Sequence, residues 1–349
     1  MKKDQYVLLK TMTWARDSHG LFDYESKNIQ KKNIRANCSG KLIRISNEVQ
    51  FLSEKIDTNH VDDRSNLAHI SLAKGQYSIS PFDENQPLWL ALRVTKSNED
   101  SKCYNLNEGS IIKLGRVKFK ISALHTSSFE PLTFIQGSSE NFLPEESVCR
   151  ICLCDSNDQE NPLISPCICK GTMKHIHVQC LQKWVSSKFS TKTGPNSEIF
   201  CWKSMDCELC KSPYPASVQV GRRVYAIFTS GDIQTPYCMI ESMSRDSNNH
   251  RMLYLVSFKN KCSITMGRGH DSDLRVSDIS VSRMHAMIRY VNGKFILEDN
   301  SSKFGTLVML QEPKKVEAED EFVMQIGRTV FEVSIKSGIR GDASIDEDF

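Results

Sequence analysis

Hydrophobic and polar residues alternate in short runs over most of the chain, and Gly, Asn, Asp and Ser separate these runs. Alternation with this period predicts β-strands that bury one face. Good examples are the segments Met252–Phe258, Met284–Val291 and Lys294–Glu298. The last two are joined by Asn292-Gly293, which is a strong signal for a tight β-hairpin. We therefore predict a mainly β fold.

Two distant segments of the chain resemble each other. IKLGRVKFKIS at Ile112–Ser122 aligns with MQIGRTVFEVS at Met324–Ser334. Each predicts two short strands around a Gly-Arg turn, with the Phe and the final Ser in register. We interpret the pair as two related β-domains, while any hairpin with Gly-Arg at its tip produces the same pattern.

The alternation stops in a cysteine-rich block. The chain contains 13 cysteines, and nine of them lie between Cys149 and Cys210. This clustering favours metal ligands over disulfides spread across the fold. The order is Cys149-x2-Cys152, fourteen residues, Cys167-x-Cys169, seven residues, His177-x2-Cys180, twenty-six residues and Cys207-x2-Cys210.

Four closely spaced ligand pairs suit two tetrahedral zinc ions. We predict a crossed arrangement with two structural zincs, in which the first and third pairs bind one ion and the second and fourth pairs bind the other. Metal binding then contributes to folding, because the block has little apolar content for a core. The predicted ligands are Cys149, Cys152, His177 and Cys180 for one ion and Cys167, Cys169, Cys207 and Cys210 for the other.

Two further choices concern side chains near these ligands. His177 is preferred over His175 because it forms a tight pair with Cys180, whereas His175 points elsewhere in an extended stretch. Cys154 and Cys201 are left over, and we expect them to be free thiols.

After the third pair, Leu181, Trp184 and Val185 fall on one face of a predicted helix. The block around them resembles a RING-CH (variant RING) finger, as found in the membrane-associated RING-CH ubiquitin ligases. The resemblance covers about residues 146–215, and Pro166, Gly171, Trp184 and the Cys-x-Cys second pair all match. A PHD finger has the same ligand order, but it has a wider second pair and a Trp where Met205 stands here.

The RING-CH resemblance implies a function without a catalytic side chain. Such fingers bind a ubiquitin-conjugating enzyme and orient its thioester, which is proximity catalysis with no covalent intermediate on the finger. By resemblance, Ile151, Trp184 and Pro213 would dock that enzyme. Two departures are the long insert between Cys180 and Cys207 and the missing membrane helices of the membrane-associated family.

Downstream, three loops lie between predicted strands: Gly267-Arg268-Gly269, Ser282-Arg283-Met284-His285 and Ser302-Lys303-Phe304-Gly305-Thr306. In this order they resemble a forkhead-associated (FHA) domain, a β-sandwich that binds phosphothreonine peptides, over about residues 218–338. The resemblance implies phosphate contacts by Arg268, Ser282, Arg283 and Lys303. It makes His285 a loop-bracing residue and assigns loop-shaping roles to Gly267, Gly305 and Thr306.

Phe304 departs from the FHA pattern, because many members carry Asn there to hold the peptide backbone. The alternative is a domain that keeps the shape without binding phosphate. The N-terminal region, residues 1–142, is β-rich and leaves open whether it is a degenerate FHA-like copy. It has Gly115-Arg116 but no early Gly-Arg, so we expect no phosphate site there. Residues 339–349 form an acidic tail that we expect to be frayed.

Charge and hydropathy exclude some classes of function. The net charge is +3 with both signs mixed, so we expect no nucleic-acid partner. No apolar run approaches the ~18 residues of a membrane helix, and Lys10 and Arg16 interrupt any signal-peptide core. We therefore expect a soluble, intracellular protein, cytoplasmic or nuclear, without a membrane partner.

The sequence thus predicts a two-zinc RING-type ubiquitin ligase that binds a conjugating enzyme and recruits phosphothreonine-containing partners. One alternative is a phosphopeptide-binding adaptor whose zinc module is purely structural. A chromatin reader is a third hypothesis, which the ligand spacing disfavours.

Overall fold

The computed structural model describes residues 4–16, 20–54, 64–83, 86–93, 103–126, 147–194, 197–202, 206–212, 214–215, 217–221, 223–227, 235–244 and 251–338. The chain divides into two compact units. The first combines Met1–Ile121 with Cys262–Phe349, and the second is Ser122–Lys261. The acidic tail, 339–349, lies outside the described residues.

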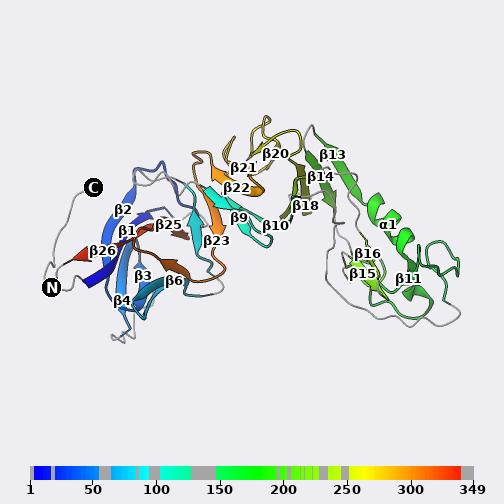
Figure 1. Ribbon diagram of the computed structural model, residues 1–349, viewed down its shortest axis with the longest axis horizontal. Coiled ribbons are helices and arrows are strands. Elements are labelled where there is room, and N and C mark those ends of the chain that lie inside the picture. The colour runs from blue at the N-terminus through cyan, green and yellow to red at the C-terminus, as the bar shows by residue number, and fades with distance from the viewer. Residues whose placement is uncertain are drawn as a thin grey trace. The chain divides into compact units, whose positions relative to one another are not determined.

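The first unit contains a β-sandwich built from both ends of the chain. Its strands are β1 (Asp4–Trp14), β2 (Ile29–Ala36), β3 (Gly40–Ile45), β4 (Glu48–Ser53), β5 (Arg64–Ala73), β6 (Gln76–Pro81), β7 (Trp89–Ala91), β24 (Lys314–Val316), β25 (Glu321–Ile326) and β26 (Thr329–Gly338). One layer has the order β7-β25-β26-β1-β2, and the other has the order β24-β6-β5-β3-β4 (Figure 1). Val7, Leu42, Ile79 and Phe331, from strands of both layers, belong to one buried cluster, so the two sheets share a core.

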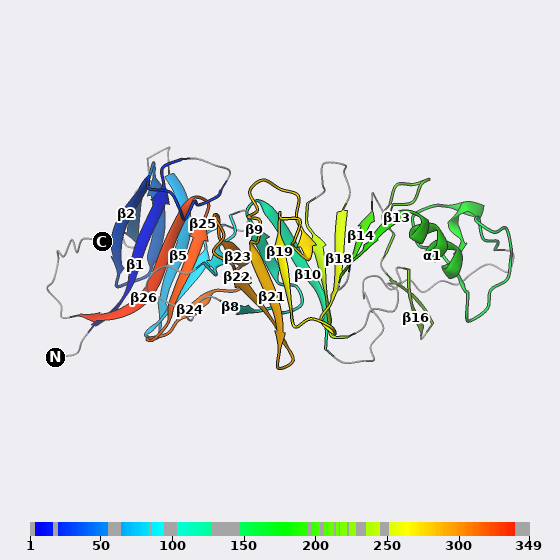
Figure 2. The same ribbon diagram turned by 90° about the horizontal axis from the view of Figure 1, so that it is seen from above.

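The N-terminal and C-terminal strands form the longest ladder of this sandwich. β1 pairs with β26 from Asp4↔Gly338 to Thr13↔Thr329, and both views show the two strands side by side (Figures 1 and 2). Buried residues alternate along β1, as expected for a strand with one face in the core, whereas the first half of β26 is buried at almost every position. The two ends of the chain therefore belong to the same folded body.

The same unit contains a second group of strands. They are β8 (Cys103–Asn105), β9 (Ile111–Leu114), β10 (Val117–His125), β19 (Ser263–Gly267), β20 (Leu274–Arg275), β21 (Ala286–Val291), β22 (Lys294–Asp299) and β23 (Thr306–Met309). One sheet has the order β20-β19-β21-β22-β8, and β9 joins β10 to β23 in the other. Ile264, Ile288, Leu297, Ile112 and Phe119, from strands of both sheets, are fully buried.

The hairpins that the sequence predicts are present. Val291 pairs with Lys294, and both loop residues, Asn292 and Gly293, have positive φ, which confirms the two-residue turn. The Gly-Arg repeat also forms two hairpins, β9–β10 and β25–β26. Gly115 and Gly327 have φ values of 57° and 55°, a conformation that glycine adopts without strain.

The compact units differ from the predicted domain boundaries, 1–142 and 218–338. Strands of the two predicted domains pair with each other: β24 with β6, β8 with β22 and β9 with β23. Residues 218–261 belong instead to the second unit. Strand pairing between distant segments, which a local sequence pattern does not specify, accounts for the difference.

The second unit holds the cysteine-rich block. Its elements are β11 (Leu163–Ile164), a 3-10 helix (Gly171–Lys174), β12 (Ile176–His177), α1 (Val178–Ser187), β13 (Phe189–Thr193), β14 (Ser197–Trp202), β15 (Ser217–Val220), β16 (Arg223–Ala226), β17 (Tyr237–Ser242) and β18 (Arg251–Ser257). Leu181 and Val185 of α1 are buried against Ile176 and Leu163 in one small core. This core also includes cysteine side chains, so the metal ligands and the apolar residues stabilise the same body.

The long insert between Cys180 and Cys207 has a defined structure. It completes α1 and then forms the hairpin β13–β14, whose second strand pairs with β18. β18 pairs in turn with β17, so the insert extends a sheet in the second unit. Among the described residues, no helix has the length and apolarity needed to cross a bilayer.

Candidate zinc centres and phosphate-binding loops

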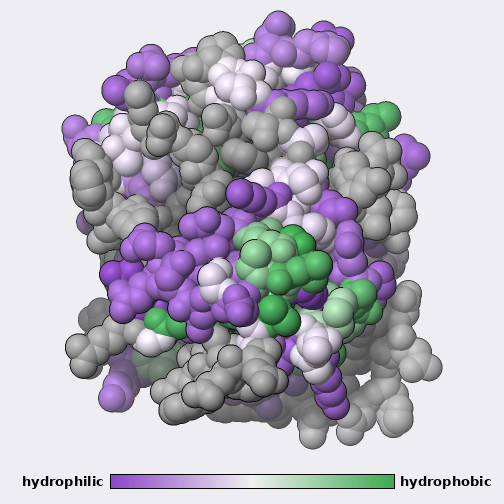
Figure 3. Space-filling view, turned by 90° about the vertical axis from the view of Figure 1, so that its right-hand side faces the viewer, coloured by the Kyte–Doolittle hydropathy of each residue, from purple (hydrophilic) through white to green (hydrophobic). Residues whose placement is uncertain are grey.

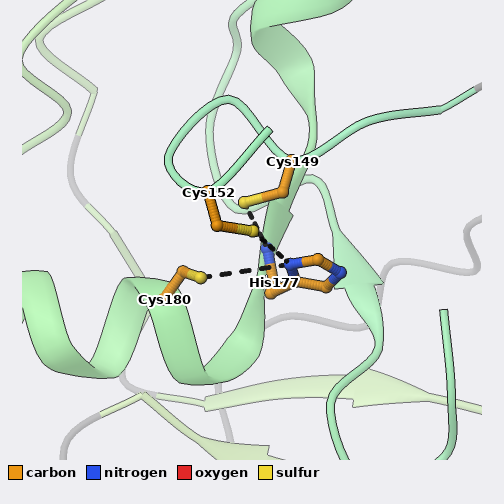
Figure 4. A group of neighbouring side chains, drawn as sticks. All are labelled: Cys149, Cys152, His177 and Cys180. Atoms are coloured by element: carbon orange, nitrogen blue, oxygen red, sulfur yellow. Dashed lines mark hydrogen bonds between the residues drawn. The ribbon is translucent and has the colours of Figure 1, made fainter. Parts of the chain in front are cut away.

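The first ligand cluster joins three cysteines and one histidine. The side chains of Cys149, Cys152, His177 and Cys180 point toward one another, and their ligand atoms all lie within 4.8 Å of each other (Figure 4). His177 lies at the N-terminal end of α1, and Cys180 lies in the first turn of that helix. The helix therefore presents the third ligand pair to the loop that carries the first pair.

The second cluster contains four cysteines: Cys167, Cys169, Cys207 and Cys210, also with all sulfur atoms within 4.8 Å of one another. The first and third ligand pairs thus form one cluster and the second and fourth form the other. This is the crossed arrangement that the spacing predicts.

The two Cys-x2-Cys loops have the same backbone turn. Leu153 donates its N–H to the carbonyl of Cys149 at 2.8 Å, and Lys211 donates to Cys207 at 2.9 Å. Leu153 and Lys211 both have positive φ, 61° and 60°. A turn of this kind directs both sulfur atoms of a pair to the same side.

The distances between ligand atoms fit zinc. A tetrahedron with Zn–S bonds of about 2.3 Å separates its sulfur atoms by about 3.8 Å. The sulfur atoms of Cys169 and Cys207 lie 3.7 Å apart, and His177 Nδ1 lies 3.9 Å from Cys180 Sγ and 3.2 Å from Cys152 Sγ. The protein therefore has two sites for zinc, one with three cysteines and one histidine as ligands and one with four cysteines.

Neighbouring groups select the histidine ligand. The Nε2 atom of His177 is hydrogen-bonded to the carbonyl of Ser156, which leaves Nδ1 free to bind the metal. His175 belongs to neither cluster and contacts the hydroxyl of Ser165 at 3.3 Å. Burial lowers the pKa of His175. Cys154 and Cys201 also belong to neither cluster.

Arg150 connects the two clusters, a role that the ligand spacing does not reveal. It follows Cys149 of the first cluster, but its Nη2 lies 3.3 Å from the sulfur of Cys207 in the second. The same guanidinium donates to the hydroxyl of Tyr214 at 2.9 Å and to the carbonyl of Met173. Although burial opposes ionisation, backbone N–H groups, Tyr214 and Arg150 lower the pKa of Cys207 to about 5.

The finger exposes apolar side chains on its metal-binding loops. Figure 3 shows a hydrophobic patch bordered by hydrophilic residues. Ile151, Ile168 and Leu209 are 44%, 73% and 54% exposed, and each lies between the two cysteines of a ligand pair. Leu153 and Met173 are also exposed. Of these five residues, the sequence predicted only Ile151 to contact a conjugating enzyme. The position of Ile168 and Leu209 between ligand cysteines is a sequence signal that could have identified them as well.

The other two residues predicted to dock a conjugating enzyme lie differently. Trp184 is half-buried, and its ring meets that of Tyr214 edge to face at 5.6 Å. Lys188 lies 5.1 Å from the centre of the Trp184 ring and forms an ion pair with Glu208. Pro213 lies outside the described residues.

The predicted phosphate contacts meet at adjoining loops of the second strand group. Arg268 follows β19, and its N–H donates to the carbonyl of Ser282 at 2.9 Å. A Cβ atom at Gly267 would lie 2.1 Å from the carbonyl oxygen of Arg283, so a side chain at this position would push the two loops apart. The side chains of Arg268 and Arg283 are exposed.

His285 braces these loops in the structure. It is fully buried, its Nδ1 accepts the N–H of Ser282 at 3.0 Å, and its Nε2 lies 3.1 Å from the carbonyl of Gly305. Burial lowers the pKa of His285, which favours the neutral ring that this pattern requires. Lys303 donates its N–H to the hydroxyl of Ser282 at 3.1 Å.

The third loop is held on both sides. Thr306 is buried and donates to Asp299 at 2.7 Å. Gly305 has a φ of 74°, and a Cβ atom there would lie 2.8 Å from the ring of Tyr24. The side chain of Lys303 forms an ion pair with Asp23 at 3.4 Å.

Phe304 has a packing role. Its ring lies 6.4 Å from that of Trp14, and it packs against a buried cluster that includes Leu21, Phe22 and Trp89. An apolar side chain at the place where many FHA domains carry Asn thus joins the third loop to N-terminal residues. This contact gives a physical reason for the departure.

The comparisons with known proteins agree with this geometry. Residues 149–210 match the model of the RING-variant domain, and residues 264–327 match the model of the FHA domain. The chain carries a RING-variant domain and an FHA domain. The RING-variant match begins and ends at ligands of the two clusters, and the FHA match contains all three loops that the sequence predicts to contact phosphate.

Similar curated proteins are ubiquitin ligases. The chain is 35% identical over 119 residues to E3 ubiquitin-protein ligase MARCHF8 of Xenopus tropicalis. This alignment covers 34% of this chain and 36% of the relative. The chain is 41% identical over 66 residues to MARCHF1 of Homo sapiens, covering 19% and 18%. It is 34% identical over 104 residues to the ERAD-associated E3 ubiquitin-protein ligase DOA10 of Saccharomyces cerevisiae, and this alignment covers 30% of this chain and 7% of the relative. The matched regions therefore span about a third or less of these relatives' lengths.

Proposed function

We propose that this protein is a RING-type ubiquitin-protein ligase that docks a conjugating enzyme on its finger and recruits phosphothreonine-containing partners through its FHA domain. One observation carries the ligase assignment. Three of the four ligand pairs hold an exposed apolar residue between their cysteines: Ile151, Ile168 and Leu209. Exposed apolar side chains on rigid loops suit a protein interface. The printed names of the similar proteins support the same activity.

The finger contributes position to the reaction. A substrate lysine amine attacks the thioester carbonyl of ubiquitin on the conjugating enzyme, so a C–N bond forms and the C–S bond breaks. The enzyme's cysteine leaves as a thiolate, and the amine loses a proton. The finger supplies no nucleophile to this step. It holds the loaded enzyme near the amine, which raises the rate through proximity and orientation.

The FHA loops suit a phosphate ligand. Arg268, Arg283 and Lys303 provide positive charge, and Ser282 provides a hydroxyl, on adjoining loops. Charge-assisted hydrogen bonds of this kind contribute about 1.5–3 kcal/mol each. Because finger and FHA domain share one chain, a partner held at the loops meets the finger at a raised effective concentration.

A reconstituted ubiquitylation reaction tests the ligase assignment. The full chain is incubated with ubiquitin, activating enzyme, ATP and a panel of conjugating enzymes, and chain formation is followed on gels. We expect chains with at least one enzyme, and we expect Ile168→Asp to abolish them while two zincs stay bound. If no enzyme supports chains but phosphothreonine peptides bind, the protein is the adaptor of the alternative hypothesis.

A further inference from the structure

The two strand groups of the first unit have matching sheet orders. One five-stranded sheet is β24-β6-β5-β3-β4, and the other is β8-β22-β21-β19-β20. In each, four strands come from one continuous stretch of chain, 40–81 or 263–299, while the outer strand comes from the opposite half. β24 lies at the C-terminal end of the chain and completes the N-terminal sheet. β8 precedes the finger and completes the C-terminal one.

The repeated hairpins show the same exchange. The hairpin β9–β10 lies in the N-terminal half, yet β9 pairs with β23 of the C-terminal half from Leu114↔Thr306 to Ile112↔Val308. The hairpin β25–β26 lies at the C-terminal end, yet β26 pairs with β1. Each half of the chain thus gives its closing strand and hairpin to the other half. Neither half alone contains all the strands of its sandwich.

The Gly-Arg turn of the exchanged hairpin reaches the loop that carries Ser282. The N–H of Arg116 donates to the hydroxyl of Ser280 at 2.9 Å, and its guanidinium lies 3.6 Å from Asp278. A Cβ atom at Gly115 would lie 2.4 Å from the Ser280 hydroxyl and 2.5 Å from its carbonyl oxygen. Glycine is therefore required for this close approach.

This contact is connected to the predicted phosphate residues by a short series of hydrogen bonds. Ser280 donates its N–H to the carboxylate of Asp278 at 2.8 Å, and Val281 donates its N–H to the backbone carbonyl of Asp278 at 3.0 Å. The carbonyl of Val281 accepts Nε of Arg268 at 3.2 Å, and the carbonyl of Ser282 accepts the N–H of Arg268 at 2.9 Å. The loop that Arg116 contacts therefore carries Ser282 and provides the carbonyls that hold Arg268, two of the residues predicted to contact phosphate.

We propose that the two sandwiches exchange their closing segments, and that the turn at Gly115-Arg116 thereby positions the phosphate-binding loop of the FHA domain. Arg116 is a positioning residue, since it acts on phosphate through Ser282 and Arg268. The proposal rests on the proposed phosphothreonine-binding function. It implies that the residues matched by the FHA model, 264–327, are incomplete as a binding domain without 103–121.

The other Gly-Arg turn provides a matched control. Arg328 donates to the carbonyls of Trp14 and Ser46, both at 2.7 Å, and also contacts the side chain of Asn47. It therefore holds a turn of the N-terminal sandwich through its side chain, away from Arg268 and Ser282 in the sequence and in strand order. Arg328→Ala removes more side-chain contacts than Arg116→Ala does, from the sandwich that has no predicted phosphate site, so it is a strict control for a general loss of stability.

The first experiment compares Arg116→Ala, Arg116→Lys and Arg328→Ala in the full chain. Affinity is measured by fluorescence anisotropy with a degenerate phosphothreonine peptide library, and amide hydrogen exchange is measured over residues 276–285. Arg116→Ala keeps the backbone hydrogen bond to Ser280 and removes the partly exposed ion pair with Asp278, so we expect it to weaken binding by about two- to fivefold and to speed exchange in that segment. We expect Arg116→Lys to restore most of the affinity and Arg328→Ala to change neither quantity.

The outcomes separate the two proposals. If the wild-type chain does not bind the library, phosphothreonine binding is refuted, and the exchange rates of 276–285 still decide whether Arg116 positions the loop. If the wild type binds and Arg116→Ala leaves both affinity and exchange unchanged, the positioning proposal is overturned. Equal effects of Arg328→Ala and Arg116→Ala would also overturn it, because a general loss of stability would then explain both.

A second experiment tests the strand exchange with a single substitution. Cys103 of β8 is exposed and lies directly opposite Glu298 of β22. Directly opposed side chains in a sheet are close enough for a disulfide after small adjustments. Glu298→Cys should link to Cys103 within one chain under mild oxidation, as peptide mass spectrometry would show. A link from Ser78→Cys in β6 to Cys103 would instead show that each half keeps its own closing strand.

Discussion

The guanidinium of Arg150 lies 3.3 Å from the sulfur of Cys207. Arg150 directly follows Cys149, a ligand of the first zinc cluster, whereas Cys207 is a ligand of the second. Zn²⁺ bound by four cysteine thiolates has a net charge of about −2, whereas Zn²⁺ bound by three thiolates and a neutral histidine has about −1. Arg150 therefore places its positive charge beside the more negative of the two sites. The contact also ties the first metal-binding loop to the second cluster.

Removal of the Arg150 charge should loosen zinc in the four-cysteine site selectively. A lost charge-assisted hydrogen bond corresponds to about a tenfold change in affinity or more. We expect Arg150→Met to release one of two zinc equivalents about tenfold faster to a colorimetric chelator, with the other unchanged. The control is Arg223→Met, which removes an exposed arginine that pairs with Glu160. Uniform acceleration of both zincs would contradict a role specific to the four-cysteine site.

The ligand assignment predicts the zinc content of cysteine variants. Cys149 is fully buried in the finger core, so Cys149→Ser should lose one zinc and partly unfold the second unit. Cys154→Ser, close by in the sequence and outside both clusters, should keep both zincs. Elemental analysis of purified chains measures the difference. Fewer than about two zincs in well-folded wild-type protein would remove the basis of the assignment.

Trp184 is predicted to affect ligase activity more than metal binding. Its ring contacts Tyr214 and Lys188, but its side chain provides no ligand. We expect Trp184→Ala to lower chain formation by about tenfold or more, as for an aromatic residue in an interface. Zinc content should stay at two per chain. A loss of zinc together with activity would mean that Trp184 supports the finger core instead of a docking surface.

The zinc ligands could be predicted because their signal is local. Pairs such as Cys149 and Cys152 are close in sequence, and a single turn brings their sulfur atoms together. The Asn292-Gly293 hairpin was also predictable, since its two residues specify the turn. The Gly-Arg repeat predicted both hairpins for the same reason.

The partners of these hairpins could not be predicted. β9–β10 and β25–β26 have nearly the same pattern of apolar residues, so either can complete either sandwich as far as local sequence shows. Pairing between residues as distant as Leu114 and Thr306 depends on the whole chain. Phe304 was recognised as a departure, but its contact with Trp14 was not, because the two are far apart in sequence.

Arg268 is predicted to be essential for phosphothreonine binding and dispensable for folding. Its side chain is exposed and makes one hydrogen bond, from Nε to the carbonyl of Val281, whereas its backbone N–H contacts Ser282. Substitution therefore removes one loop contact and leaves the backbone hydrogen bond in place. We expect Arg268→Ala to weaken peptide binding by about a hundredfold, the effect of a lost charged contact to phosphate. Arg275→Ala, an exposed arginine in β20, is the control. Equal binding by both variants would exclude Arg268 from the site.

Phe304→Asn should destabilise the first unit without improving peptide binding. Many FHA domains carry Asn at this place, but here the ring packs against Trp14 and a buried apolar cluster. Replacing a half-buried aromatic ring with an amide loses that packing and places a polar group beside apolar side chains. We expect a loss of about 1–3 kcal/mol in the free energy of unfolding, measured by denaturant titration. The matched variant Trp14→Leu should lower stability in the same direction, and the double variant should lose less than the sum because the two rings interact. A gain in phosphopeptide affinity with unchanged stability would show that the ring at position 304 obstructs the peptide and does not anchor the loop.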